Sequence, residues 1–329
     1  MIDTRYVFAA ICFVVTVSSF ADDAAQARQY SLTQTDETIS ISDARGTVLV
    51  YNKTAPALPR GMDSIYARDA FLHPVNSPSG RTVTDLYPAD HPHQNGIFCA
   101  WVNTRYDGRK IDFWNLHRRQ GRVVHDRVLS TFENDDGVGF EVALIHRITE
   151  KPVVDVLAER WKVTVRPSVQ SLRCFDIDIH QTALTDISLV VNKYKYGGMA
   201  VRGAGTELPR DKVSGQAEAN KKPVGKMVTD SGRDRLAGNH SVARWVSLTS
   251  GTNANPVTIT LMSHPENFRS PQRVRLHPTM PYFCFAPCVD EQFAIDKQHP
   301  YSGRYRVIVA DGQPNNTLLQ KQWQAWIQP

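Results

Sequence analysis

Two histidines separated by one proline open the stretch DHPHQNGIFCAWVNTRYDGRKIDFW, which runs from Asp90 to Trp114. Residues two apart in an extended segment face the same way, and a proline favours an extended conformation in the residue before it. The imidazoles of His91 and His93 are therefore predicted to project together. Two convergent imidazoles can bind a metal, transfer a proton or hydrogen-bond to sugar hydroxyl groups. The preceding Asp90 could orient one of the rings.

The same spacing also has structural explanations, because histidines often only satisfy local hydrogen bonds. A divalent metal held by His91 and His93 is an alternative, with His264 or Asp112 as a third ligand and one position left open. The sequence contains no H-x-x-x-H pattern and no clustered Cys/His spacing. The cofactor therefore stays open, and proton transfer is the preferred interpretation of the two histidines.

Strand-like patterns dominate the elements that must position these residues. Alternating, β-branched runs bounded by Gly, Pro or Asn occupy 47–52, 139–148, 153–165, 174–184, 256–264 and 304–312. A helical period appears only in TLLQKQWQAWIQ, after the turn signal DGQPNN. The segment 202–239, rich in Gly, Lys, Asp and Pro, is predicted to be a long loop. The sequence thus predicts an all-β fold, a large antiparallel β-sandwich with a short C-terminal helix.

Five sequence blocks resemble those of the PmoA-like family, an exported bacterial domain with the usual pattern D-H-P-H-H-R-G-L-W-F followed by D-F-W. They are DHPHQNGIFCAW with IDFW, YKYGGMAVR, ARWVSLTSG, HPENFRSPQRVRLHP and GRYRVIVADG. The blocks keep the family order across roughly residues 45 to 325. The chain departs from the pattern at Gln94 and Asn95, which replace the second His and the Arg, and at Ser247, which replaces an Asp after W-V. A mechanism that needs that arginine or aspartate is in doubt here.

The resemblance implies one β-sandwich domain over residues 22–329, similar to the galactose-mutarotase-type supersandwich. The family label alludes to methane oxygenase, but the apolar leader is followed by no membrane span and no membrane copper site. A genuine methane monooxygenase subunit is therefore rejected. Broad sandwich faces suit saccharides, which need aromatic platforms and planar polar groups.

The blocks supply candidate residues for such a site. His91 and His93 are the expected acid/base groups, and Asp112 is expected to be their partner carboxylate. Arg202 is expected to bind an anionic group or a hydroxyl group of the substrate. His264 is expected to join them as a catalytic residue from a distant strand end. The expected substrate-binding residues are Trp101, Trp114, Tyr196, Gly197, Gly198 and Asn267.

The leading hypothesis is a secreted carbohydrate-active enzyme of hydrolase, lyase or epimerase type that acts on a saccharide or other small molecule. A non-catalytic glycan-binding module and a metal-dependent enzyme are the alternatives. Nucleic acid is not an expected partner, because 38 basic and 33 acidic residues interleave without a patch and give a net charge of only +5.

The N-terminus predicts export to the periplasm or the extracellular space. Tyr6 to Phe20 is apolar or small, too short for a membrane span of about 20 residues, and Ser19-Phe20-Ala21 fits a cleavage site. Residues 1–21 are therefore predicted to be a signal peptide. An even number of cysteines remains beyond it, which permits disulfides without requiring them; these are Cys99, Cys174, Cys284 and Cys288.

Overall fold

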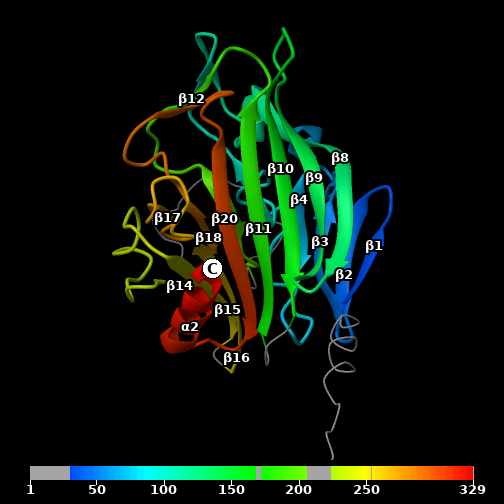
Figure 1. The fold of residues 1–329 in the computed structure, drawn as a ribbon, viewed down its shortest axis with the longest axis vertical. Coiled ribbons are helices and arrows are strands. Elements are labelled where there is room, and N and C mark those ends of the chain that lie inside the picture. Colours follow the sequence, from blue (N-terminus) through cyan, green and yellow to red (C-terminus); the bar gives the residue numbers. More distant parts are fainter. Residues whose placement is uncertain (1–29, 168–171, 206–223, 253, 329) are drawn as a thin grey trace, which may run out of the picture.

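The computed structural model describes residues 30–167, 172–205, 224–252 and 254–328, so the expected signal peptide lies outside the described residues. Two eight-stranded antiparallel sheets pack face to face, with a four-stranded sheet at one end (Figure 1). One continuous hydrophobic core joins all three sheets, and a second, smaller cluster lies under the C-terminal helix. The expected large antiparallel sandwich is confirmed.

The first sheet has the strand order β1-β2-β3-β4-β5-β13-β18-β17. Its strands are β1 (Tyr30–Gln34), β2 (Thr38–Asp43), β3 (Gly46–Asn52), β4 (Phe71–Val75), β5 (Ile97–Ala100), β13 (Gly198–Arg202), β18 (Tyr282–Phe285) and β17 (Val274–Leu276). Two consecutive blocks of the sequence pattern thus become neighbours, because the strand after the HPH motif pairs with the strand that ends at Arg202.

The second sheet has the order β14-β15-β16-β20-β11-β10-β9-β8. Its strands are β14 (Lys226–Thr229), β15 (Trp245–Thr252), β16 (Asn255–Ser263), β20 (Tyr301–Asp311), β11 (Leu172–Ala183), β10 (Val154–Arg166), β9 (Gly137–Ile148) and β8 (Gly121–Asn134). The small sheet has the order β19-β12-β6-β7, with β19 (Phe293–Ile295), β12 (Leu189–Val191), β6 (Thr104–Tyr106) and β7 (Arg109–Ile111).

Helical structure is limited in the described residues. Two short 3-10 turns are η1 (Ser64–Tyr66) and η2 (Leu116–Arg118), and the C-terminal helix is α2 (Asn316–Ile327). The Asn315 side chain caps α2 by accepting the backbone N–H of Leu318. This confirms the helix expected from the 3.6-residue period. None of the helices in the described ranges has the length and apolar character needed to cross a membrane.

One sequence expectation needs revision. The long loop expected over 202–239 is interrupted by β14, which adds an edge strand to the second sheet, while 206–223 lie outside the described residues. The disulfide state, which the sequence left open, is settled for the four cysteines that the structure describes, because all of them are free thiols. Three of them are buried, and Cys174 is half-buried.

The pairing register decides which side chains of the first sheet face the second sheet. Cys99 and Trp101 face it, because both contact Gln181 of β11. Phe98 therefore points the opposite way, and so do the residues paired in line with it. This opposite side, called the outer face below, carries Phe98, Ala200, Cys284 and Arg275 in one row and Arg202 with Tyr282 in the next.

Gly96 allows the HPH segment to enter β5 at the edge of this face. It has φ +54°, and a Cβ built on it would lie 1.9 Å from the carbonyl oxygen of Leu72. A side chain at this position would push β4 away from β5. The glycine after the HPH motif thus serves the close approach of two backbones.

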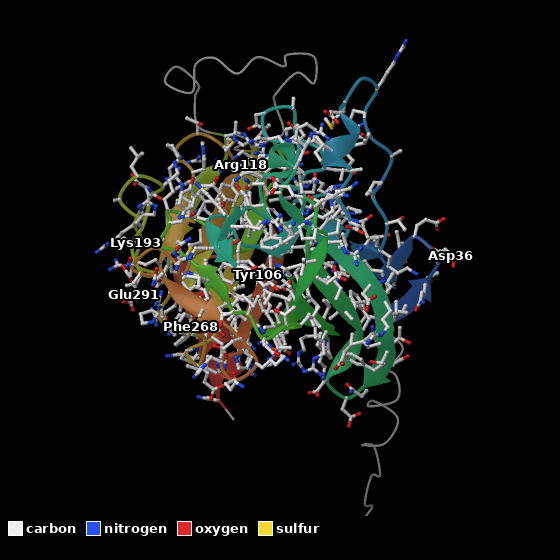
Figure 2. All side chains as sticks on the ribbon, turned by 90° about the horizontal axis from the view of Figure 1, so that it is seen from above. Asp36, Tyr106, Arg118, Lys193, Phe268 and Glu291 are labelled. Carbon is white, nitrogen blue, oxygen red and sulfur yellow. The ribbon has the colours of Figure 1, made fainter. Side chains whose placement is uncertain are left out.

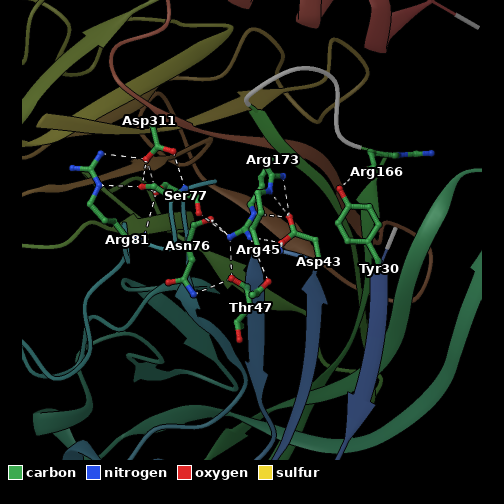
Figure 3. Close-up of polar contacts among 12 residues, drawn as sticks. Tyr30, Asp43, Arg45, Thr47, Asn76, Ser77, Arg81, Arg166, Arg173 and Asp311 are labelled. Carbon is green, nitrogen blue, oxygen red and sulfur yellow. Dashed lines mark hydrogen bonds and ion pairs between the residues drawn. The ribbon is translucent and has the colours of Figure 1, made fainter. Parts of the chain in front are cut away.

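The two sheets are also tied together by a buried ion pair at one end of the sandwich (Figure 3). The Arg173 guanidinium on β11 donates to the Asp43 carboxylate on β2 at 2.7 Å, and both side chains are almost fully buried. Its remaining donors bond to the carbonyl oxygens of Gly46, Thr47, Asn76 and Ser77.

Candidate functional site

Four imidazoles from three separate segments gather over the outer face. We call His91, His93, His117 and His277 the histidine cluster. Between ring centroids, His91 lies 5.5 Å from His93 and 6.2 Å from His277, and His93 lies 5.7 Å from His117. The HPH segment, η2 and the turn after β17 supply these rings. The predicted convergence of His91 and His93 is therefore part of a larger group.

An ion pair anchors the HPH segment to β13. Asp90 accepts two hydrogen bonds from the Arg202 guanidinium, at 2.7 and 3.3 Å, and the Arg202 side chain is 1% exposed. Burial would raise the pKa of the Asp90 carboxyl, but the nearby His91 ring and the Arg202 cation outweigh it and hold this pKa well below its usual range. Asp90 is thus ionised, with one oxygen 3.7 Å from His91 Nδ1.

His93 and His277 are neutral imidazoles at neutral pH. Burial lowers the pKa of His93 well below 6.5, and the neighbouring His91, His117, Arg68 and Arg202 lower it further. Its Nε2 is buried without a hydrogen-bond partner. An imidazole that stays unprotonated can accept a proton, so the His93 ring has the state that a general base needs.

His277 is kept neutral by the same causes. Burial, followed by the charges of Arg275, His91 and Arg202, lowers its pKa to about 3. Its Nδ1 accepts the backbone N–H groups of Thr279 and Met280, so the single proton of the neutral ring resides on Nε2.

This neutral ring gives a pH-dependent contribution to stability. Because the pKa of His277 is about 3 when folded and 6.5 when exposed, the unfolded state binds a proton that the folded state does not, and stability falls as pH falls through this window. His277→Asn, which keeps an acceptor near the Nδ1 position, is expected to reduce the slope by up to about 1.4 kcal/mol per pH unit. Urea unfolding across this pH range measures the slope, and an unchanged slope would contradict the assignment.

Asp112, expected as the partner carboxylate, closes a turn instead. Its buried side chain accepts the backbone N–H groups of Trp114 and Asn115 and the Asn115 amide, all at 2.8 to 2.9 Å. Arg118 lies 3.4 Å from its second oxygen. The carboxylate therefore shapes the segment that carries His117, and its acceptor positions are occupied by groups of this turn.

The substitution Asp112→Asn separates this positioning role from a catalytic one. The new amide would face the Asn115 amide and the Arg118 guanidinium, both donors, so about 1–3 kcal/mol of stability should be lost. Because the oxygens of the carboxylate are engaged by its own turn, kcat should fall by less than about tenfold, below the range for a lost acid/base group. Thermal unfolding and steady-state kinetics together test this, and a drop of about a thousandfold in a folded variant would restore Asp112 as a catalytic group.

Aromatic rings line the outer face beside the cluster. The Trp114 ring lies 4.6 Å from Phe98, 5.3 Å from Tyr196 and 5.8 Å from Tyr282, measured between centroids. Trp114 is fully buried and its Nε1 has no hydrogen-bond partner, whereas Tyr196 is half-buried. Trp114 and Tyr196, both predicted to bind substrate, are therefore neighbours. Tyr282 connects them to the histidine cluster, because its ring contacts both Trp114 and His277.

Trp101, also predicted to bind substrate, belongs to the core. Its Nε1 donates to Gln181 at 2.8 Å between the two sheets, and its ring packs edge-on against Tyr301 and Phe293. The expectation of a platform at this position is corrected, because the odd-numbered residues of this strand face inward.

The two glycines before β13 serve chain packing. Gly197 and Gly198 have φ +135° and +115°, and a Cβ on Gly198 would lie 2.5 Å from the carbonyl oxygen of Phe285. Gly197 carries its carbonyl near the Cys288 thiol. The structure thus explains both glycines by backbone conformation and neighbouring strands, in place of the expected substrate approach.

His264 and Asn267 are not brought to the cluster. The His264 ring packs edge-on against Trp326 of α2 at 5.0 Å, and Asn267 joins the loop to Ser263 and the backbone of Arg304. In Figure 2, Arg118 of η2 lies on the side of the molecule away from α2. Their predicted place in one pocket with His91 and His93 is corrected.

Sequence reasoning missed His117, His277, Tyr282 and Arg68. His117 follows the D-F-W motif by three residues, and His277 precedes a proline as His91 does, so weak signals were present. Arg68 had none. It is 3% exposed, its Nη1 donates to the carbonyl oxygen of His93 at 3.1 Å, and its guanidinium stacks 4.1 Å from the Phe98 centroid.

Two of the three positions named above as departing from the PmoA-like pattern also serve the HPH segment. Gln94 accepts a hydrogen bond of 3.4 Å from Arg202, and Asn95 accepts the backbone N–H of Tyr87 while donating to Pro92. Ser247 lies in the second sheet, bonded to Thr260. Within the described ranges no group of three or more His, Cys, Asp or Glu side chains is arranged to hold a metal ion.

Comparisons with known proteins give a family and remote structural similarity. No curated protein matches the sequence. Among solved structures, heparan sulfate lyase HepC from Pedobacter heparinus is similar at 8% identity and a TM-score of 0.38, covering 87% of this chain and 35% of that one. A protein assigned as a kojibiose phosphorylase, from the human microbiome, is similar at 7% identity and a TM-score of 0.36, covering 94% and 34%.

The chain spans about a third of the length of both proteins, and similarity at this level carries no argument about activity. The family match is more extensive, because it takes in the HPH segment, β13, the turn that carries His277 and most of α2. The resemblance to the PmoA-like family stays a prediction. Residues 38–324 match the model of a family described as "Family of unknown function (DUF6807)", and the chain belongs to that family.

Proposed function

We propose that this chain is an exported saccharide-acting enzyme that moves a proton at a sugar carbon, as a lyase or an epimerase does. The observation that carries the proposal is the His93 ring, which is buried, neutral and unpartnered at Nε2 within a cluster of four imidazoles. The half-buried Tyr196, which packs on the buried Trp114 beside the cluster, supplies the kind of surface that a sugar ring packs against. The apolar N-terminus supports export.

The carboxylates near the cluster argue against a hydrolase of the usual type. Glycoside hydrolysis by two carboxyl groups needs one group to protonate the leaving oxygen and another to attack or activate water. Asp90 is engaged by Arg202, which holds it ionised, and Asp112 is engaged by its own turn. Neither carboxylate is placed to exchange protons with a substrate.

Imidazoles suit the alternative chemistry. His93 would take the proton from the sugar carbon as general base. His91 is placed to return a proton from the other side of the pair, because its side chain is 32% exposed and can exchange protons with solvent. In this arrangement Asp90 is a positioning residue, and the reaction needs the imidazoles in opposite protonation states.

Solvent deuterium exchange tests the proposal directly. The mature protein would be incubated in heavy water with a panel of saccharides, and deuterium at ring carbons would be followed by NMR together with new double bonds and new epimers. Wash-in or product formation on at least one saccharide is expected. Metal content measured on the same sample separates a metal-assisted reaction from one carried by imidazoles alone.

Binding of a saccharide without exchange, elimination or epimerisation would overturn the enzyme proposal and leave a glycan-binding module. Release of a reducing sugar without a double bond would instead restore the hydrolase alternative. Both results would be informative only for a folded protein, so unfolding curves accompany the assay.

A further inference from the structure

Buried donors without partners are concentrated around Phe98 on the outer face. Arg68 leaves Nε and Nη2 unpartnered, Arg202 leaves Nε, and Trp114 leaves Nε1. All three side chains are 3% exposed or less. Each unsatisfied buried donor costs about 1–3 kcal/mol of folding free energy. A native structure retains such donors where a functional role, such as hydrogen bonding to a bound ligand, explains them.

Other buried arginines of the same chain show what a purely structural arginine looks like. Arg173 bonds through Nε, Nη1 and Nη2 to a carboxylate and to carbonyl oxygens. Arg235 places Nη1 and Nη2 on four backbone carbonyl oxygens. Among the described residues, Arg68 and Arg202 are the arginines that keep buried side-chain nitrogens without a partner. Both contact the HPH segment.

The free edge of Arg68 has a particular shape. Its Nη1 is used by the carbonyl oxygen of His93, which leaves the Nε and Nη2 pair, two parallel N–H groups on one side of the guanidinium. This edge matches the two oxygens of a carboxylate, and bidentate Arg–carboxylate pairs are among the strong hydrogen-bonded contacts in proteins.

The charges around this position also favour an anion. Arg68, Arg202 and the half-buried Arg275 face the outer side near the cluster, and all three lower the pKa of one of its histidines. Of the carboxylates near the cluster, Asp90 is already bound by Arg202, and Asp112 is engaged by its own turn and by Arg118.

Two further carboxylates lie within range of Arg68 but are directed elsewhere. Asp69 accepts the backbone N–H of His125, and Glu159 accepts the ring N–H groups of His146 and Trp161. In the described part of the chain, neither forms an ion pair with Arg68. The site therefore carries an excess of positive charge beside a neutral base.

We propose that the substrate is an acidic saccharide of the uronate class, whose carboxylate is bound by the Nε–Nη2 edge of Arg68. This rests on the proposed function and names its substrate class. The fork and the base are adjacent, because Arg68 bonds to the backbone carbonyl of the same residue whose ring would take the proton. A bound cation next to the carboxylate favours the enolate that forms when the neighbouring carbon loses its proton.

Two reactions, elimination and epimerisation, can follow from the same proton abstraction, and atoms and electrons balance in both. His93 takes the proton from the carbon next to the carboxylate, and the C–H electron pair moves into the enolate. In elimination, that pair forms a C=C bond as the C–O bond at the next carbon breaks, and the leaving oxygen takes a proton from an imidazolium. In epimerisation, the carbon is reprotonated on the opposite face and no bond to oxygen breaks.

Calorimetric binding of three matched oligosaccharides tests the inference. One contains uronate residues, the second is the same oligosaccharide with the carboxyl groups reduced to alcohols, and the third is that neutral form carrying sulfate esters. Wild type is expected to bind the uronate form at least tenfold tighter than the other two. Arg68→Lys, which keeps the charge and loses the fork, should lower uronate affinity at least tenfold and leave the neutral form unchanged.

Arg304→Gln is the control, because this arginine lies on the second sheet and pairs with Glu266; its affinities should equal those of wild type. Arg275→Met, a change on a half-buried side chain, should weaken uronate binding severalfold and also serves if Arg68→Lys does not fold. Equal wild-type affinity for the uronate and reduced forms would overturn this inference alone. Preference for the sulfated form would overturn the carboxylate assignment, whereas tight uronate binding without deuterium exchange would overturn the proposed function.

Discussion

The substitution His93→Gln is expected to lower kcat of the proton-transfer reaction by about 10²–10⁴-fold, the usual contribution of a positioned acid or base. Glutamine has a similar volume and remains polar, but it cannot take a proton. The contact between Arg68 and the backbone carbonyl of residue 93 is preserved, because it does not involve the side chain. Substrate affinity should therefore change much less than turnover, which steady-state kinetics with the exchanging saccharide would measure.

The pH profile adds a second readout that a merely structural histidine would not affect. Because the pKa of His93 lies well below 6.5, the base is unprotonated in mildly acidic solution, and kcat/KM should hold until the pH falls below the ordinary histidine range. His264→Gln is the matched control, since this histidine packs on α2 away from the cluster. Activity of His93→Gln within a few-fold of wild type, or a loss as large in His264→Gln, would sink the assignment.

Much of the fold follows from two-residue alternation. Runs such as 139–148 and 174–184 largely alternate buried and half-buried positions, and they form β9 and β11 as expected. The edge strand β14 escaped prediction because it is short and follows a segment rich in Gly, Lys and Pro. Packing against β15 selects the strand there, and four residues carry too little pattern to reveal it.

The site was only half predictable. His91 and His93 do lie together, but in a turn closed by the Gln94 N–H and the His91 carbonyl oxygen in place of the expected extended segment, and Arg202 joins them because β13 pairs with β5. His117 and His277 arrive from segments whose neighbours in space are set by strand order, which local spacing does not encode. Asp112 and Trp101 were assigned to the site from the family blocks. Asp112 instead closes a turn, and Trp101, directly after β5, faces the second sheet, so both have structural roles.

Conversely, His264 and Asn267 belong to a block of the expected family pattern and still lie elsewhere. Both follow β16, a central strand of the second sheet, and the block turns toward α2 before the chain crosses to β17. His277, ten residues after Asn267, lies on the first sheet with the other histidines. One block of the sequence can thus span both sides of a sandwich, and only its last part reaches the site.

The substitution Arg173→Leu is expected to cost about 3–5 kcal/mol of stability, the range for breaking a buried ion pair by removing one partner. The change leaves the buried Asp43 carboxylate with Arg45 alone and strips the carbonyl oxygens of Thr47 and Ser77 of a donor (Figure 3). Urea unfolding monitored by tryptophan fluorescence would measure the loss. Activity at low temperature should be retained, because the residue lies between the sheets at β2, away from the outer face.

Arg45→Leu is the control with the same carboxylate, because Arg45 also binds Asp43 but is 40% exposed. Its cost should stay near or below about 1 kcal/mol, as for exposed pairs. The double variant Asp43→Leu/Arg173→Leu should recover part of the loss, since it removes the uncompensated charge. Equal costs for the two single arginine variants would show that burial does not set the strength of this pair. It would also weaken the contrast between Arg173, whose donors are all matched, and the arginines of the site, whose unmatched donors we assign to a ligand.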